Sequence, residues 1–341
     1  MKTGNIIKFN IILLTICSII LAEGEQQFAE LGEFKLEKGG TIQNCKIGYR
    51  CFGKLNQDST NVILFPTWFG GTSGHLANLI DNYKLVNKDS YYIIAVDALG
   101  NGISSSPSNS ADQSGENFPA VTIRDMVHTQ YKLLTEKMGF EHIFAIVGGS
   151  MGSFQTFEWL VLYPDFMNKA VPYVCTPKLT PPDKLWMKLQ LEIVYSALDS
   201  GCSKARTQKI LDIYSRMTGR TPEFFYQNMS DREFEEFYNQ FEPRLDERFT
   251  FYNRAYQIKA MLNFDITRHF DNSLEEAASA VKADLFMIVS ETDQLVNPGL
   301  SKKLANISDA KILVLKNNCG HLGVGCEIEK CTHAIAEFLE N

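Results

Sequence analysis

The chain alternates short apolar runs with amphipathic stretches, and this alternation predicts strands and helices in turn. The runs have the length and the β-branched content typical of buried strands. They lie at 62–65, 91–96, 143–147, 170–174, 285–289 and 312–315. Apolar spacing near 3.6 predicts helices over 122–139, directly after residue 150 and over 326–339. Repeated strand–helix units predict an α/β fold with a mostly parallel central sheet and helices on both faces.

Two segments depart from this alternation. Residues 34–36 and 46–52 read as two strands joined by a turn at Lys38-Gly39-Gly40. Residues 177–272 are polar, rich in aromatic residues and largely helical in pattern, and the strand pattern resumes after them. We therefore predict one domain over 23–341 with an inserted helical cap at about 177–272, in preference to a second domain.

The first 22 residues form a segment of their own. Lys2 and Lys8 precede the apolar run 9–21, and the small residues Ala22 and Gly24 follow it. The run is too short to span a bilayer comfortably, and its flanks are those of a secretory signal peptide. An uncleaved N-terminal anchor is the alternative. We predict a signal peptide over 1–22, a secreted or extracytoplasmic protein, and no membrane span in the mature chain.

Composition narrows the classes of partner. The chain has 341 residues, 45% of them hydrophobic and 21% charged, which is typical of an ordinary globular protein. Its net charge is −7 and no basic cluster stands out, so we expect no nucleic-acid partner. The oligomeric state stays open, a dimer included. Asn228-Met229-Ser230 and Asn306-Ile307-Ser308 are glycosylation sequons that count only in a eukaryotic source.

The cysteines indicate a disulfide near the C-terminus. Of the eight cysteines, Cys17 belongs to the predicted signal peptide, and seven remain, so at least one is unpaired within the chain. Cys319, Cys326 and Cys331 lie close together, and a disulfide among them fits an oxidising compartment. A zinc site is the rival, but the C-x2-C spacing that zinc sites favour is absent. We expect neither a metal nor a bound cofactor.

Ser150 lies at the centre of the chain's strongest motif. The run 143–147 leads into Gly148-Gly149-Ser150-Met151-Gly152, a G-x-S-x-G pentapeptide, and helical apolar spacing follows. A strand, a tight glycine turn and a helix form the context of a nucleophile elbow, in which a strained turn lifts the serine hydroxyl above the sheet. We therefore predict Ser150 as a catalytic nucleophile.

A serine nucleophile needs a histidine base and an acid that orients this base. Behind a nucleophile elbow, the acid and then the histidine follow in chain order. Only two of the six histidines lie beyond the last predicted strands: His321 in a loop and His333 within the final helix. We predict His321 as the base. Glu291 and Asp293 both follow the strand 285–289, and we favour Asp293 because it lies in the turn that opens the next helix.

The oxyanion of an acyl-transfer intermediate needs two hydrogen-bond donors. The backbone N–H of Met151 is one by the geometry of the elbow, and we expect Trp68 N–H, in the glycine-rich loop after 62–65, to be the other. Asp97 also ends a strand, but it precedes the serine, and we interpret it as a structural turn residue.

Three segments together resemble the homoserine O-acetyltransferase family of the α/β-hydrolase superfamily. They are Thr122-Ile123-Arg124-Asp125-Met126-Val127, the stretch from Gly148 to Trp159, and Tyr163-Pro164-Asp165. The resemblance implies the α/β-hydrolase fold and a Ser-His-Asp triad working through an acyl-enzyme. It places these roles on Ser150, His321 and Asp293.

The chain also departs from this family. Homoserine-specific members carry Asp after the catalytic histidine to receive the substrate ammonium, whereas this chain has Leu322. An ammonium buried against leucine would be unpaired, at a cost of several kcal/mol. The family's Gly-Ser-Thr-Gly-Pro signature is missing too, and Gly102-Ile103-Ser104-Ser105-Ser106-Pro107 stands in that region. We conclude that the chain is a divergent member that does not use homoserine.

Two enzyme functions then compete. One is a secreted esterase that hydrolyses a small acyl ester through acyl-Ser150. The other is a CoA-dependent O-acyltransferase with an acceptor other than homoserine and acyl-CoA as co-substrate. The predicted signal peptide favours the esterase, because acyl-CoA is scarce outside the cytosol. A non-catalytic binding protein of the same fold is disfavoured by the complete set of Ser150, Asp293 and His321.

Overall fold

The computed structural model describes residues 23–243 and 245–341. The predicted signal peptide, residues 1–22, lies outside the described residues. Eight strands form one sheet in the order β1-β2-β4-β3-β5-β6-β7-β8. The pairs β1–β2 and β2–β4 are antiparallel, and every pair from β4 to β8 is parallel. The strands are β1 (Gln27–Lys35), β2 (Thr41–Phe52), β3 (Val62–Pro66), β4 (Tyr92–Val96), β5 (Ile143–Gly149), β6 (Met167–Tyr173), β7 (Asp284–Ser290) and β8 (Lys311–Leu315).

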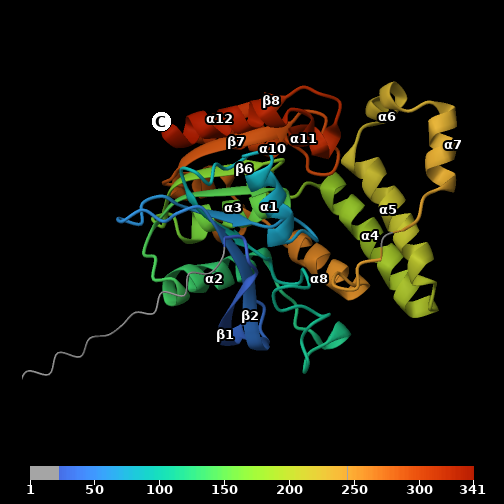
Figure 1. Cartoon of the computed structure of the whole chain (residues 1–341), viewed down its shortest axis with the longest axis horizontal. Coiled ribbons are helices and arrows are strands. Elements are labelled where there is room, and N and C mark those ends of the chain that lie inside the picture. Colours follow the sequence, from blue (N-terminus) through green and yellow to red (C-terminus); the bar gives the residue numbers. More distant parts are fainter. Residues whose placement is uncertain (1–22, 244) are drawn as a thin grey trace, which may run out of the picture.

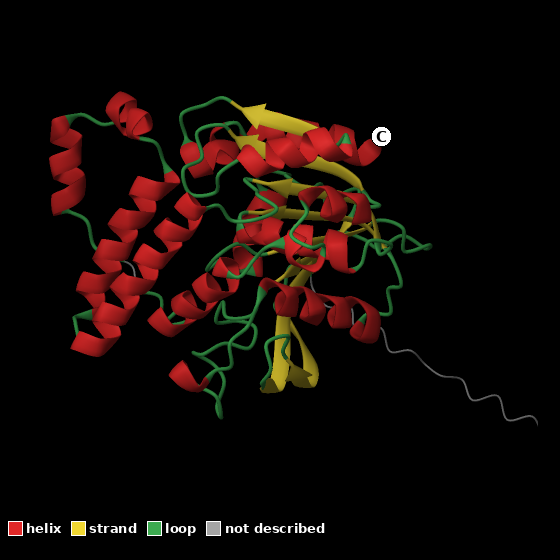
Figure 2. Ribbon diagram, turned by 180° about the vertical axis from the view of Figure 1, so that it is seen from behind, coloured by secondary structure: helices red, strands yellow, loops and turns green. Residues whose placement is uncertain are grey.

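Helices cover both faces of this sheet (Figure 2). Successive strand residues point to opposite faces, so Val62 and Leu64 join one apolar cluster while Ile63 and Phe65 join the other. On the first face pack α2 (Ile123–Lys132), α3 (Met151–Leu162), α9 (Leu274–Ala280) and α10 (Gly299–Ser308). On the second face pack α1 (Ser73–Asp81) and α12 (Ile328–Glu340). The mostly parallel sheet with helices on both faces confirms the predicted fold class.

Among the described residues, five α-helices lie between β6 and α9 in the sequence, where the cap was predicted. They are α4 (Pro181–Ser200), α5 (Lys204–Gly219), α6 (Pro222–Asn228), α7 (Asp231–Asn239) and α8 (Phe251–Leu262). Figure 1 shows α4 to α7 to one side of the sheet. In α8, Ile258 and Ala260 are fully buried and belong to the main apolar cluster, so this last helix joins the cap to the sheet domain.

Several element bounds differ from the prediction. The first two strands are longer than expected, although the turn at Lys38–Gly40 is as predicted. The helix expected over 122–139 starts in a capping box at Thr122 and ends in a π-helical turn, Leu133–Lys137. The C-terminal helix begins at Ile328, because residue 326 ends the short α11 (Gly323–Cys326). No helix within 23–243 and 245–341 combines the length and apolar character required to cross a membrane.

Candidate active site

Ser150 occupies a sharp turn between β5 and α3. Its backbone has φ 55° and ψ −122°, and its N–H donates to the carbonyl of Tyr173 at 3.0 Å. The flanking glycines allow this turn, since a Cβ at Gly149 would lie 2.1 Å from the Tyr173 ring and one at Gly152 would lie 2.6 Å from the carbonyl oxygen of Pro66. A non-glycine residue with positive φ at such a turn is a strained conformation that clusters at functional sites.

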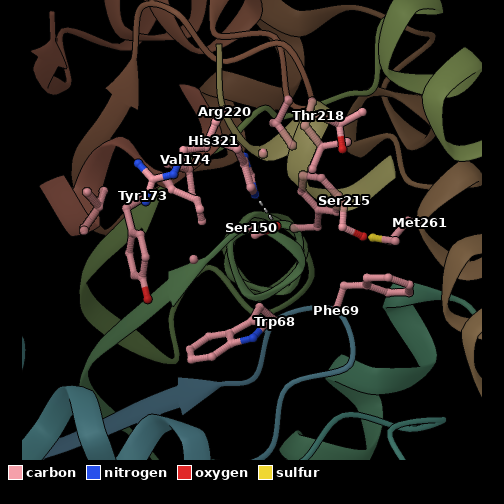
Figure 3. A pocket seen from close by; sticks show the side chains of 18 of the residues that line it. Trp68, Phe69, Ser150, Tyr173, Val174, Ser215, Thr218, Arg220, Met261 and His321 are labelled. Carbon is pink, nitrogen blue, oxygen red and sulfur yellow. Dashed lines mark hydrogen bonds between the residues drawn. The ribbon is translucent and has the colours of Figure 1, made fainter. Parts of the chain in front are cut away.

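The structure brings Ser150, His321 and Asp293 together from three distant parts of the chain. His321 Nε2 lies 2.9 Å from Ser150 Oγ (Figure 3). His321 Nδ1 lies 2.7 Å from Asp293 Oδ2. Asp293 belongs to the loop after β7, further from α10 than the sequence indicated. Its Oδ1 accepts from the N–H groups of Leu295 and Val296, both at 2.9 Å, which leaves Oδ2 for the imidazole.

This carboxylate sets the protonation of the imidazole. The His321 side chain is 10% exposed and that of Asp293 is 2% exposed. Burial alone lowers the pKa of His321, but the charge of Asp293 and its hydrogen bond outweigh burial and raise the pKa above its ordinary value. An imidazole held in this way can take a proton from Ser150 Oγ and keep it as a stabilised imidazolium.

The alternative carboxylates take other positions. The Glu291 side chain is half exposed and pairs with Lys302 at 3.3 Å. Asp97 is fully buried and accepts from Ser73 N–H at 2.8 Å, Ser73 Oγ at 2.7 Å and Asn101 Nδ2 at 2.9 Å, which fits its interpretation as a structural turn residue.

The loop that carries His321 is closed by a disulfide between Cys319 and Cys326. The disulfide predicted among the three C-terminal cysteines is therefore present, and it replaces the zinc alternative. Cys331 is free and buried. A second tie comes from Thr292 Oγ1, which accepts from Gly320 N–H at 3.2 Å. His333 is an exposed residue of α12.

The loop after β3 meets the first turn of α3. Thr67 N–H donates to the carbonyl of Val96 at 3.1 Å, and Gln155 Nε2 donates to the carbonyl of Thr67 at 3.0 Å. The next residue is Trp68. Within the described residues, neither Trp68 N–H nor Met151 N–H donates to an acceptor. The free N–H of Met151 is one of the first groups of a helix, where the helix dipole favours negative charge.

Ser150 and His321 open into a cavity of about 660 Å³. The sheet domain contributes a mainly apolar wall that includes Trp68 and Val174, and the cap contributes Thr218 and other residues of α4 and α5 (Figure 3). The cavity is also lined by Phe69, Gln190, Arg220, Leu322 and Cys326. Such a concave, mostly apolar space with a few polar groups is typical of a small-molecule site.

Nothing in the described ranges suggests a metal centre. Within 23–243 and 245–341, no three His, Cys, Asp or Glu side chains are grouped closely enough to hold a metal ion.

Comparison with known proteins places this geometry in a family. Residues 60–325 match the family model described as "alpha/beta hydrolase fold". The chain belongs to the α/β-hydrolase family. It is 33% identical over 324 residues to a probable esterase of Corynebacterium glutamicum. The alignment covers 89% of this chain and 91% of that protein. It is 30% identical over 316 residues to an ethyl acetate hydrolase of Pseudomonas veronii, covering 88% and 90%.

The resemblance to homoserine O-acetyltransferases is also confirmed. The enzyme of that name from Methanosalsum zhilinae is 28% identical over 353 residues, covering 91% of this chain and 71% of that one. Among solved structures, an acetylester hydrolase from Corynebacterium glutamicum superposes with a TM-score of 0.84 at 28% identity, covering 93% of this chain and 96% of that one. The chain is therefore an enzyme of the hydrolase and acyltransferase type, and a non-catalytic function is set aside.

Sequence reasoning missed some residues around the site. Thr292 had no signal, because a single threonine in a loop does not reveal that it accepts from Gly320 N–H and donates to the carbonyl of Asn317 at 2.9 Å. Arg220 was hidden in the cap, where no motif marks it. The enclosure of His321 by Cys319 and Cys326 could have been found, since the two cysteines flank the histidine in the printed sequence.

Proposed function

We propose that this protein is a secreted, serine-dependent esterase that hydrolyses a small acyl ester through an acyl-Ser150 intermediate. The observation that carries the proposal is the unbroken hydrogen-bonded series from Ser150 Oγ through His321 to Asp293 at the wall of a cavity. The strained elbow at Ser150 and two free N–H groups nearby support it.

Acylation begins when Ser150 Oγ attacks the ester carbonyl and His321 Nε2 takes the hydroxyl proton. Negative charge then develops on the carbonyl oxygen, and the N–H groups of Met151 and Trp68 receive it. A donor of this kind contributes about 3 to 4 kcal/mol to the transition state. Asp293 stabilises the imidazolium and keeps Nδ1 protonated. His321 then returns the proton to the leaving alcohol, and the acyl group stays on Ser150.

Deacylation repeats these steps with water. His321 takes a proton from a water molecule, whose oxygen attacks the acyl carbonyl, and the same two N–H groups hold the second oxyanion. The released acid and the restored hydroxyl of Ser150 complete the cycle. No metal or bound cofactor is required in this scheme.

Transfer of the acyl group to an alcohol is the second candidate. A protein that aligns with 91% of this chain is named a homoserine O-acetyltransferase. Leu322 argues against an amino-acid acceptor. Leu322 follows His321 directly and is 48% exposed. A Cβ added at Gly219, at the end of α5, would lie 3.9 Å from Leu322 Cδ1. An apolar side chain therefore occupies the cap side of the cavity. Two relatives, at 33% and 30% identity, are named a probable esterase and an ethyl acetate hydrolase, and these names favour water as the acceptor and acetate as the acyl group.

Two measurements test the proposal. Ser150→Ala should abolish both ester turnover and covalent labelling by a fluorophosphonate; labelling that persists would mean that another residue is the nucleophile. Ethyl acetate hydrolysis should be followed with and without acetyl-CoA and a small alcohol. A rate of acid release that does not change with acceptor supports hydrolysis, whereas product shifted to a new ester supports transfer.

Secretion rests on separate observations, namely the pattern of residues 1–22 and the Cys319–Cys326 disulfide, which fits an oxidising compartment. Expression of the full chain in eukaryotic cells, followed by N-terminal sequencing of the protein in the medium, tests it. A mature N-terminus near residue 23 is expected. Retention of the uncleaved chain in the membrane fraction would identify an anchor instead.

A further inference from the structure

The Cys319–Cys326 disulfide encloses the proposed base. The two cysteines are separated by seven positions, and His321 is the second residue after Cys319. The short segment between them also provides part of the cavity wall, because Leu322, Val324 and Cys326 all line it. A change at this disulfide therefore acts on the base and on the substrate cavity together.

The two sulfurs differ in accessibility. Cys319 is 5% exposed, whereas Cys326 is an exposed residue at the cavity. Exchange requires the attacking thiolate to approach one sulfur of the disulfide in line. Because Cys326 is the more exposed of the two cysteines, we expect attack at its sulfur, with the buried Cys319 as the leaving group.

A cation stands beside the accessible sulfur. Arg220 Nη1 lies 3.3 Å from Cys326 Sγ, and the guanidinium stacks over the Phe224 ring with its Cζ 4.0 Å from the ring centroid. Partial burial lowers the pKa of Arg220, yet the group stays charged at neutral pH. A fixed positive charge attracts an anionic reagent and stabilises a thiolate that forms next to it.

We propose that Cys326 is a thiol–disulfide exchange site for a small thiol that carries a carboxylate, and that exchange there releases the loop holding His321. The proposal rests on the proposed function only for its effect on activity. In the first step the thiolate forms a bond to Cys326 Sγ, the Cys326–Cys319 bond breaks, and Cys319 leaves as a thiolate that takes a proton. A second thiol can then attack the mixed disulfide, which yields the dithiol and the oxidised small thiol.

Exchange alters the site in two ways. The mixed disulfide places a bulky group on the cavity wall at Cys326. The His321 loop then keeps only weaker ties, among them the 3.2 Å bond from Gly320 N–H to Thr292 Oγ1. Displacement of a catalytic group by about 1 Å can cost on the order of 100-fold in rate. We expect reaction at Ser150 to fall by about tenfold or more.

The experiment uses residues 23–341 with Cys202→Ser. Cys202 is the one free cysteine among the described residues that is exposed, so its removal leaves fewer competing thiols. Reduced glutathione and cysteamine are compared at equal thiolate concentration without denaturant, and adducts are located by mass spectrometry. Glutathione should modify Cys326 about threefold or more faster at low salt, and this preference should shrink as salt screens Arg220. In Arg220→Gln the two thiols should react at similar rates.

Activity is measured on the same samples as the rate of fluorophosphonate labelling of Ser150. Labelling should slow as the adduct accumulates and recover when free thiol is removed, because Cys319 then displaces the small thiol from Cys326 and the disulfide re-forms. Cys319→Ala/Cys326→Ala should label slowly and lose all sensitivity to thiols.

Absence of both an adduct at Cys326 and a reduced Cys319–Cys326 pair, or unchanged labelling after both cysteines are fully alkylated, would overturn the proposal. If the oxidised protein does not label at all, the proposed function fails, while the mass data still decide the exchange site.

Discussion

Replacement of Asp293 by Asn is the sharpest test of the proposed mechanism, because the structure fixes how the new amide would lie. Asp293 Oδ1 accepts from two backbone N–H groups, those of Leu295 and Val296. The amide oxygen of Asn must keep this place, since an amide NH2 there would face two donors. The NH2 group is then turned toward His321 Nδ1, where the carboxylate oxygen lies 2.7 Å away in the native protein.

An NH2 group in that position selects the other tautomer of the imidazole. Nδ1 becomes an acceptor, so the ring proton moves to Nε2, which faces Ser150 Oγ and can no longer take its proton. The stabilising charge is lost at the same time. Together these changes should lower kcat by about 10⁴-fold, or roughly 5 kcal/mol of transition-state stabilisation.

The pH profile gives an independent readout. Activity needs neutral His321 and is lost as the pH falls through its pKa. In the native protein Asp293 outweighs burial and raises this pKa, and in the variant only the lowering effect of burial remains. The acid limb of residual kcat/KM should therefore move to lower pH.

The assay is ester hydrolysis between pH 5 and 9, with Glu291→Gln as the matched control. Glu291 lies two residues away and pairs with exposed Lys302, so its loss should leave the profile unchanged. An Asp293→Asn enzyme with near-native kcat, or with its acid limb in the native position, would refute the reasoning.

Three further predictions concern the frame around the site. Gly152→Ala should lower stability by about 2 kcal/mol or more, because its Cβ would meet the Pro66 carbonyl at 2.6 Å; a thermal melt equal to that of the native chain would contradict this. Glu158→Ala removes a buried partner 2.5 Å from Arg124 Nε and should lower the free energy of unfolding in urea by about 3 kcal/mol. A loss under 1 kcal/mol would show that Glu37, whose Oε1 lies 4.0 Å from Arg124 Nε, takes over the pairing. Thr292→Val should lower the free energy of unfolding by about 1 to 2 kcal/mol, because Gly320 N–H loses its acceptor. It should also slow fluorophosphonate labelling of Ser150 without changing the pH profile. Labelling at the native rate would show that Thr292 does not position the loop.

The sequence predicted the sheet and the elbow because both are local. A strand such as 143–147 is marked by its own apolar residues, and the glycines around Ser150 are required by atoms within a few residues or on the next strand. The meeting of Ser150 with His321 could be inferred only from chain order, and its geometry depends on how β5 and β8 lie in the sheet. The sequence favoured Asp293 over Glu291 only by its place before the next helix, and no periodicity reveals the two backbone N–H groups that orient its carboxylate.

The cap and the loop that carries His321 are in direct backbone contact. A Cβ at Gly320 would lie 3.1 Å from the carbonyl oxygen of Gly219 and 3.2 Å from the Cα of Arg220, so backbone touches backbone where the end of α5 meets the residue before His321. A hinged opening of α5 would pull on the imidazole itself. Grafting the cap of a relative onto this sheet would thus change catalytic alignment as well as substrate preference, and the graft should carry the 317–327 loop with it.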